Sequence, residues 1–106
     1  MKPEETVETH LRDRAEALGF LCYKFTSPGN NGVPDRILIG HGATIFVETK
    51  APGGKPRKLQ QKVIDKINAH GGTALVASTE EEVDKILETI IKQNTCPKKV
   101  NKKTSK

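Results

Sequence analysis

The stretch "GVPDRILIGHGATIFVETK", residues 32–50, carries two short apolar runs joined by the tight link "HGA". Runs of this length, bounded by Gly and Pro, predict a β-hairpin whose strands cover residues 35–40 and 44–50. Side chains alternate between the two faces of a strand, so Glu48 and Lys50 point the same way, roughly 7 Å apart at their Cα atoms. Two opposite charges in one strand need a reason.

Hairpin pairing supplies that reason, because it brings Asp35 nearly opposite Glu48. Two carboxylates and an ammonium then form one cluster. Carboxylates suit a hard cation such as Mg²⁺, for which Mn²⁺ would substitute, and the backbone carbonyl of Thr49 is a further candidate ligand. Phosphodiester hydrolysis needs such a cluster, because a lysine beside the ion can orient the attacking water and stabilise charge that develops on phosphorus. A surface salt bridge on an edge strand would explain Glu48 and Lys50, but not the matching height of Asp35.

Hydrophobic periodicity and turn residues predict the remaining elements. A helix over Pro3–Leu18 carries the apolar stripe Val7, Leu11, Ala15 and Leu18, and a strand follows in "FLCYKFTS". After the hairpin, Leu59, Val63, Ile67 and His70 share one face of a second helix. "TALVAS" is a wholly apolar strand of the kind buried on both faces. Thr79 and Glu82 fit a capping box that opens a third helix, with the stripe Val83, Ile86, Leu87, Ile90 and Ile91.

The resulting order is α-β-β-β-α-β-α, which predicts an α/β fold. Three early strands joined by short turns should pair antiparallel, and a strand reached through a crossover helix should join parallel. We therefore expect a mixed four-stranded sheet flanked by helices on both faces. One domain over residues 1–94 followed by a basic, disordered tail over 95–106 accounts for all 106 residues.

Charge and composition narrow the function classes. The net charge of +5 resides in the last nine residues, whose five lysines leave a body of 13 basic and 13 acidic residues. Within the body, residues 24–62 are basic and residues 79–93 acidic, which favours contact between the middle of the chain and a polyanion. Cys22 and Cys96 lack metal-like or disulfide-like spacing. No apolar stretch is long enough to span a bilayer, and the acidic N-terminus does not read as a signal peptide.

The residues Pro34-Asp35 and Glu48-Thr49-Lys50 resemble the PD-(D/E)XK nuclease signature. With their surroundings, "GVPDRILIG" and "FVETKAPGGKPRKLQQ", they resemble the compact form of the virus-type replication-repair nuclease (VRR-NUC) family over about residues 5–78. The resemblance implies a restriction-endonuclease-like core that acts on DNA with a divalent metal. It also implies that Asp35 and Glu48 bind the metal and that Lys50 serves the water.

Two further site residues rest on this resemblance. An acid on the first helix often completes such sites, and Glu8 is the candidate, with Glu5 one turn away as its competitor. A glutamine near the active site corresponds to Gln60, although Gln61 is an alternative match. The alternative without a function is that Glu8 is an exposed acid on a helix and that Gln60 is an ordinary surface glutamine.

Candidate DNA contacts surround the cluster. Lys24 and Ser27 precede the turn "PGNNG", Arg36 follows Asp35, and Lys55, Arg57 and Lys58 lie at the start of the second helix, where phosphate oxygens bind readily. The three histidines are scattered, and we interpret them as structural or solvated.

A chain this short lacks a separate base-reading module, so DNA should be recognised by shape and backbone charge. We expect a cytoplasmic, Mg²⁺-dependent endonuclease that is selective for branched DNA, most of all a Holliday-junction resolvase. A homodimer would place two active sites symmetrically at a four-way junction. The alternatives are a non-catalytic DNA-binding module and a small interaction protein that docks on a replication or repair factor.

Overall fold

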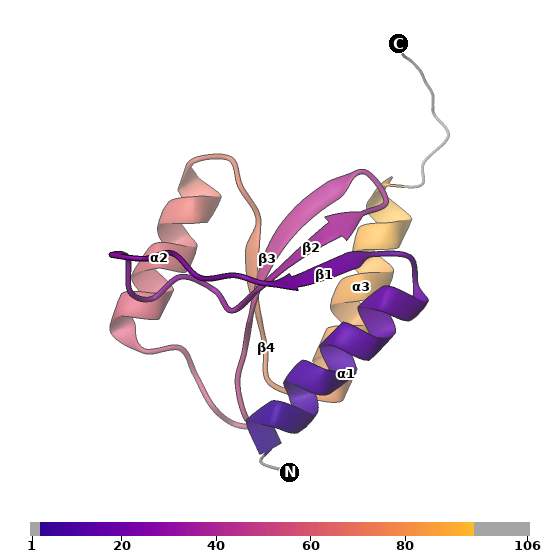
Figure 1. Cartoon of the computed structure of the whole chain (residues 1–106), viewed down its shortest axis with the longest axis horizontal. Coiled ribbons are helices and arrows are strands. Elements are labelled where there is room, and N and C mark those ends of the chain that lie inside the picture. The colour runs from indigo at the N-terminus through magenta and orange to yellow at the C-terminus, as the bar shows by residue number, and fades with distance from the viewer. Residues whose placement is uncertain (1–2, 95–106) are drawn as a thin grey trace.

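A computed structural model describes residues 3–94 and confirms the predicted order of elements (Figure 1). The predicted tail and Cys96 lie outside the described residues. The helices and strands are α1 (Pro3–Ala17), β1 (Leu21–Lys24), β2 (Arg36–Gly40), β3 (Ala43–Thr49), α2 (Lys58–Ala69), β4 (Ala74–Ala77) and α3 (Glu80–Asn94).

The four strands form one mixed sheet in the order β1-β2-β3-β4. β1, β2 and β3 pair antiparallel, and β4 joins β3 in parallel, as the crossover through α2 requires. The β2–β3 hairpin closes at the Gly40–Ala43 pair, so its loop is His41-Gly42. Both loop residues have positive φ, 52° and 79°, which is the type I′ geometry that matches the twist of a hairpin. The tight link predicted from the sequence is confirmed.

The helices form two layers, with α2 on one face of the sheet and α1 and α3 side by side on the other (Figure 1). The core lies under α1 and α3. Its fully buried side chains come from both helices and from the inward face of the sheet: Val7, Leu11 and Ala15; Leu38, Ile45, Val47 and Ala77; Val83 and Leu87. The predicted stripes of the first and third helices are therefore confirmed.

Two expectations about burial need correction. β4 is an edge strand, and its residues Leu75 and Val76 are only half-buried, because a strand with one neighbour is covered on one side only. The predicted apolar face of α2 is also more open than expected. The side chain that α2 buries is Ile64, whereas Leu59 is 50% exposed.

The outer edge of β4 is largely closed by side chains. Because the carbonyls of Thr73 and Ala77 point to β3, the backbone of Ala74, Val76 and Ser78 faces outward. The amide of Asn68 both accepts a hydrogen bond from the Ala74 N–H (2.8 Å) and donates one to the Ala74 carbonyl (3.1 Å). Glu82 accepts from the Ser78 N–H at 2.7 Å. These hydrogen bonds occupy the outward groups at the two ends of the β4 edge.

Each of the three histidines contacts the fold itself, as expected. His10 lies 2.8 Å from Asp84 and joins α1 to α3. His41 donates to the Leu18 carbonyl at 2.6 Å and packs against the Phe20 ring. His70 donates to a carbonyl within α2. Across residues 3–94 no helix combines the length and the apolarity that crossing a bilayer would need.

Candidate active site

The predicted acidic pair lies where the β2–β3 hairpin opens, at the end away from its loop. Arg36 pairs with Val47, so the next step of the same register sets Asp35 opposite Glu48. The Phe25 N–H donates to the Asp35 carbonyl at 2.8 Å, which holds this backbone beyond the end of β2. The juxtaposition inferred from hairpin geometry is therefore present in the fold.

Glu48 is the most unusual ionisable group in the described chain, because it is only 1% exposed. Its Oε2 lies 3.2 Å from the Lys50 Nζ and accepts a hydrogen bond from the Gln60 side chain at 3.3 Å. Its Oε1 is buried and has no hydrogen-bond partner among the described residues. Burial, and then the negative charge of Asp35, raise the pKa of Glu48, and the Lys50 ammonium and the Asp35 backbone only partly oppose them.

The Thr49 carbonyl faces the same region. The Lys50 N–H donates to the Ala77 carbonyl of β4 at 2.9 Å. Within one planar trans peptide the N–H and the C=O point in opposite directions, so the Thr49 carbonyl points away from β4, toward the side on which Asp35 lies. Two carboxylates and one carbonyl thus approach the same space from two strands.

This donor set fits a hard divalent cation. All of its donors are oxygen, and the partnerless Glu48 Oε1 lies in a buried setting that disfavours a bare carboxylate. In the described part of the chain, no cluster of three or more His, Cys, Asp or Glu side chains assembles. An ion held here would therefore keep several waters in its shell, as Mg²⁺ usually does.

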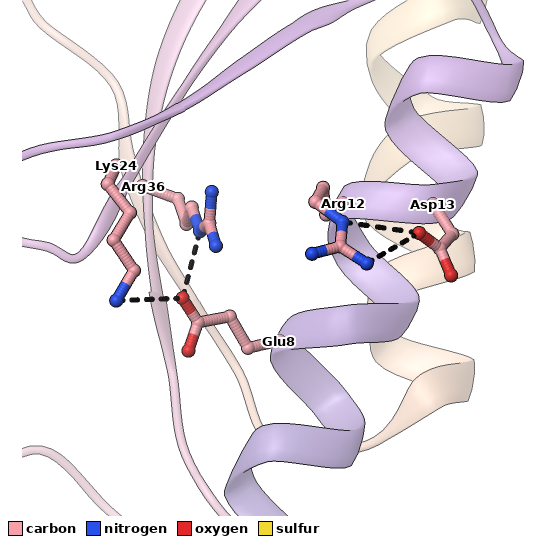
Figure 2. A network of polar contacts seen from close by, with 5 residues as sticks. All are labelled: Glu8, Arg12, Asp13, Lys24 and Arg36. Carbon is pink, nitrogen blue, oxygen red and sulfur yellow. Dashed lines mark hydrogen bonds and ion pairs between the residues drawn. The ribbon is translucent and has the colours of Figure 1, made fainter.

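Glu8 is held by cations instead of by the acidic pair (Figure 2). Its Oε2 accepts a hydrogen bond from the Arg36 Nε at 2.9 Å and lies 3.9 Å from the Lys24 Nζ. Arg36 alternates with Asp35 along β2, so its side chain leaves the opposite face of the sheet. A direct role for Glu8 in catalysis stays a prediction, as does the choice between Glu8 and the exposed Glu5.

Gln60 lies at the site, and Gln61 does not. Gln60 uses its two ends separately: its Oε1 accepts from the Arg57 N–H at 2.8 Å, and its Nε2 donates to Glu48. Gln61 is exposed and donates to Asp65 within α2. Gln60 therefore connects the first turn of α2 to the buried carboxylate. Its catalytic importance stays a prediction.

The candidate DNA contacts divide by exposure. Lys24 is 74% exposed at its side chain, and Lys55, Arg57 and Lys58 are exposed around the start of α2. Ser27 is half-buried and accepts a hydrogen bond from Asn30 within the turn. Arg36 differs from all of these, because its side chain is 11% exposed and engaged by Glu8. A DNA contact through Arg36, which would require it to leave Glu8, stays a prediction.

Sequence reasoning missed the pairing of Arg36 with Glu8, which depends on how α1 packs against β2 and has no local sequence signal.

Comparisons with known proteins are consistent with the geometry. The chain is 39% identical over 79 residues to "Putative nuclease p44" of Acyrthosiphon pisum secondary endosymbiont phage 1, which covers 74% of this chain and 85% of that protein. A solved structure described as "VRR_NUC domain" superposes with a TM-score of 0.78 at 30% identity, over 83% of this chain and 97% of its own. The sequence matches no family model.

Proposed function

Because this chain belongs to the VRR-NUC family of nucleases, we propose that it is a metal-dependent endonuclease that hydrolyses phosphodiester bonds in branched DNA. The observation that carries the proposal is the buried Glu48 carboxylate, with one oxygen unpartnered, beside Asp35 and in contact with Lys50. A purely structural glutamate would have both oxygens satisfied. We further propose the four-way Holliday junction as the preferred substrate.

Each site residue has a defined task in this proposal. Asp35, Glu48 and the Thr49 carbonyl would hold Mg²⁺, or Mn²⁺ in its place, and the ion would polarise a phosphoryl oxygen. Lys50 is 16% exposed at its side chain and lies 3.2 Å from Glu48 Oε2, where it can orient a water and stabilise negative charge on the phosphate. Gln60 fixes the rotamer of Glu48 from α2.

Substrate recognition would rest on shape and charge. The described chain has a single layer of strands between helices and no additional helical module for a DNA groove. Exposed Lys55, Arg57 and Lys58 adjoin the positive N-terminal end of α2, which reaches the site through Gln60. A homodimer that acts in the cytoplasm and presents two such sites to one junction completes the proposal.

The test offers labelled four-way, flap, nicked and linear duplexes to the protein with Mg²⁺ or Mn²⁺. We expect paired symmetric cuts at the four-way junction, and kcat lowered about 100- to 1,000-fold in Lys50→Met. Lys62→Met, an exposed lysine on α2, is the matched control and should keep wild-type cleavage.

Three outcomes would count against parts of the proposal. No cutting of any substrate with either metal would remove the nuclease assignment and favour a DNA-binding module. Equal cutting of linear duplexes would remove the preference for branches. Full activity of Lys50→Met would remove the role given to Lys50.

A further inference from the structure

The face of the sheet that carries the acidic pair also carries an exposed apolar strip. Leu21 is 51% exposed, Tyr23 is 56% exposed and Ile39 is 38% exposed. Large apolar side chains of this kind in neighbouring strands usually mark a binding surface when they are contiguous. These three come from adjacent strands, since Leu21 pairs with Ile39 and Tyr23 pairs with the next same-face residue of β2, Ile37.

The strip leads directly to the candidate active site. Side chains of one face recur every second residue, roughly 7 Å apart along a strand. The row Tyr23–Ile37–Phe46 is therefore one step from the row that contains Asp35 and Glu48. The Phe25 and Phe46 rings pack at 5.2 Å where the two rows meet. Tyr23 is therefore within reach of a nucleotide next to a phosphate held at the acids.

The fold leaves this strip uncovered. α2 is the helix on this face, and it packs chiefly against β4 at the other side of the sheet. α1 and α3 lie on the opposite face. The β1 end of the site face is consequently open, although it is apolar.

The face that carries the strip also carries a cation. Lys50 lies on the same face as Tyr23, whereas the side chain of Lys24, the next residue, leaves the opposite face and points to Glu8. An aromatic and two aliphatic side chains on the face that carries Lys50 and the proposed phosphate site match a nucleotide with an unstacked base, which has an apolar face and an anionic backbone. A paired duplex hides its base faces and could not use this strip.

We infer that Leu21, Tyr23 and Ile39 bind unpaired nucleobases of the DNA strand that enters the site, with the Tyr23 ring stacked on a base. This inference rests on the proposed function and deepens it. It assigns the strip to DNA that is single-stranded or locally opened, as the bases at a branch point are. Tyr23 acts in specificity and not in the chemical step.

The composition of the chain makes the test direct, because Tyr23 is its single tyrosine and the chain has no tryptophan. Tyrosine emission therefore reports on Tyr23 alone. The protein is titrated in EDTA, which prevents metal-dependent cutting, with a short single-stranded oligonucleotide, an abasic strand of the same length and a blunt duplex. We expect the single strand to quench the emission, and the abasic strand and duplex to leave it nearly unchanged.

Affinity measurements with a labelled single strand complete the test. Tyr23→Leu should bind it about 5- to 100-fold more weakly, and Tyr23→Phe should bind like the wild type. Thr44→Ala is the matched control, an exposed position on the same face. Quenching and affinity are both measured in EDTA, where no metal-dependent cleavage occurs, so a failure of the nuclease proposal is distinguishable from a failure here.

Two results would overturn the inference. Equal quenching by the abasic strand would mean that phosphates alone dock near Tyr23. Emission that changes on dilution without DNA would assign the strip to a second copy of the chain.

Discussion

At the scale of single residues, Glu48 shows how burial and charge prepare a site. A buried carboxylate is strongly disfavoured unless its charge and its lone pairs are compensated. Lys50 and Gln60 both approach Oε2, so compensation is concentrated on one oxygen and Oε1 remains available. Tight packing around an incompletely compensated carboxylate is the arrangement expected of a group that binds a cation.

The raised pKa of Glu48 gives a pH prediction with a definite sign. The ordinary pKa is 4.5 and the folded value is higher, so between the two the folded state binds more protons than the unfolded state. Stability in the absence of metal should therefore fall as pH rises through this window. Glu48→Gln cannot ionise, so it should melt at a higher temperature than the wild type at pH 7, with the difference vanishing below pH 4.5.

Thermal melting in EDTA from pH 4 to pH 8 measures this effect, with Glu88→Gln, at an exposed position of α3, as control. Adding Mg²⁺ should stabilise the wild type and leave Glu48→Gln unchanged. A wild type that gains stability through the same pH window would contradict the prediction.

The acid pair and Lys50 were accessible from the sequence because they depend on two local rules. A strand alternates its faces, and a two-residue loop fixes which residues pair. The partner of Glu8 follows from neither rule. It depends on the angle at which α1 crosses the sheet, which the packing of Val7, Leu11 and Ala15 decides.

At the scale of elements, the Arg36–Glu8 pair joins β2 to α1 and should stabilise the fold. Arg36→Met keeps the aliphatic stem but leaves the Glu8 carboxylate, 20% exposed at its side chain, without its main partner. We expect a loss of about 2 kcal/mol in the free energy of unfolding, and a Tm lower by roughly 10 °C.

Figure 2 contains the control for this experiment. Arg12 and Asp13 form an ion pair at 3.1 Å, but both side chains are largely exposed. Such pairs contribute little, so Arg12→Met should change the Tm by no more than a few degrees. Chemical denaturation of the wild type and the two variants gives their free energies of unfolding. Equal stability of both variants would refute the stabilising role of the Arg36–Glu8 pair.

Gln60 is a second connection between elements, from α2 to the site. Gln60→Ala removes the acceptor for the Arg57 N–H, which should destabilise the protein by about 1 kcal/mol. It also releases Glu48, and loss of such supporting contacts typically lowers metal affinity or activity about 10- to 100-fold. Calorimetric Mn²⁺ titration and cleavage rates measure both effects. Gln61→Ala, on the exposed side of α2, should leave metal binding intact.

The element order and the existence of every helix and strand were predictable from turn residues and periodicity, although the strand predicted over residues 20–27 covers only Leu21–Lys24. The position of β4 at the edge was not. An apolar run such as Ala74–Ala77 indicates that a strand is covered, but not whether it has one neighbour or two.

At the scale of the whole molecule, charge is divided between a neutral body and the sequence of residues 95–106. Its five lysines should contribute to DNA affinity through release of counterions. Deleting residues 95–106 should make the slope of log affinity against log salt shallower by up to about 4. Junction binding in EDTA at several salt concentrations measures this, with a variant carrying glutamines at the five lysines as a length-matched control. An unchanged slope would exclude the tail from DNA binding.

The side chains along the outer edge of β4 limit how another copy of the chain could add its strands to this sheet. Strand addition needs a row of open N–H and C=O groups, and Asn68 already occupies both groups of Ala74 while Glu82 occupies the N–H of Ser78. Growth by adding copies edge to edge, the route to fibrils, is hindered in that direction. A pair of molecules that shared one continuous sheet through β1, the other edge, would bring two copies of Tyr23 to the same seam.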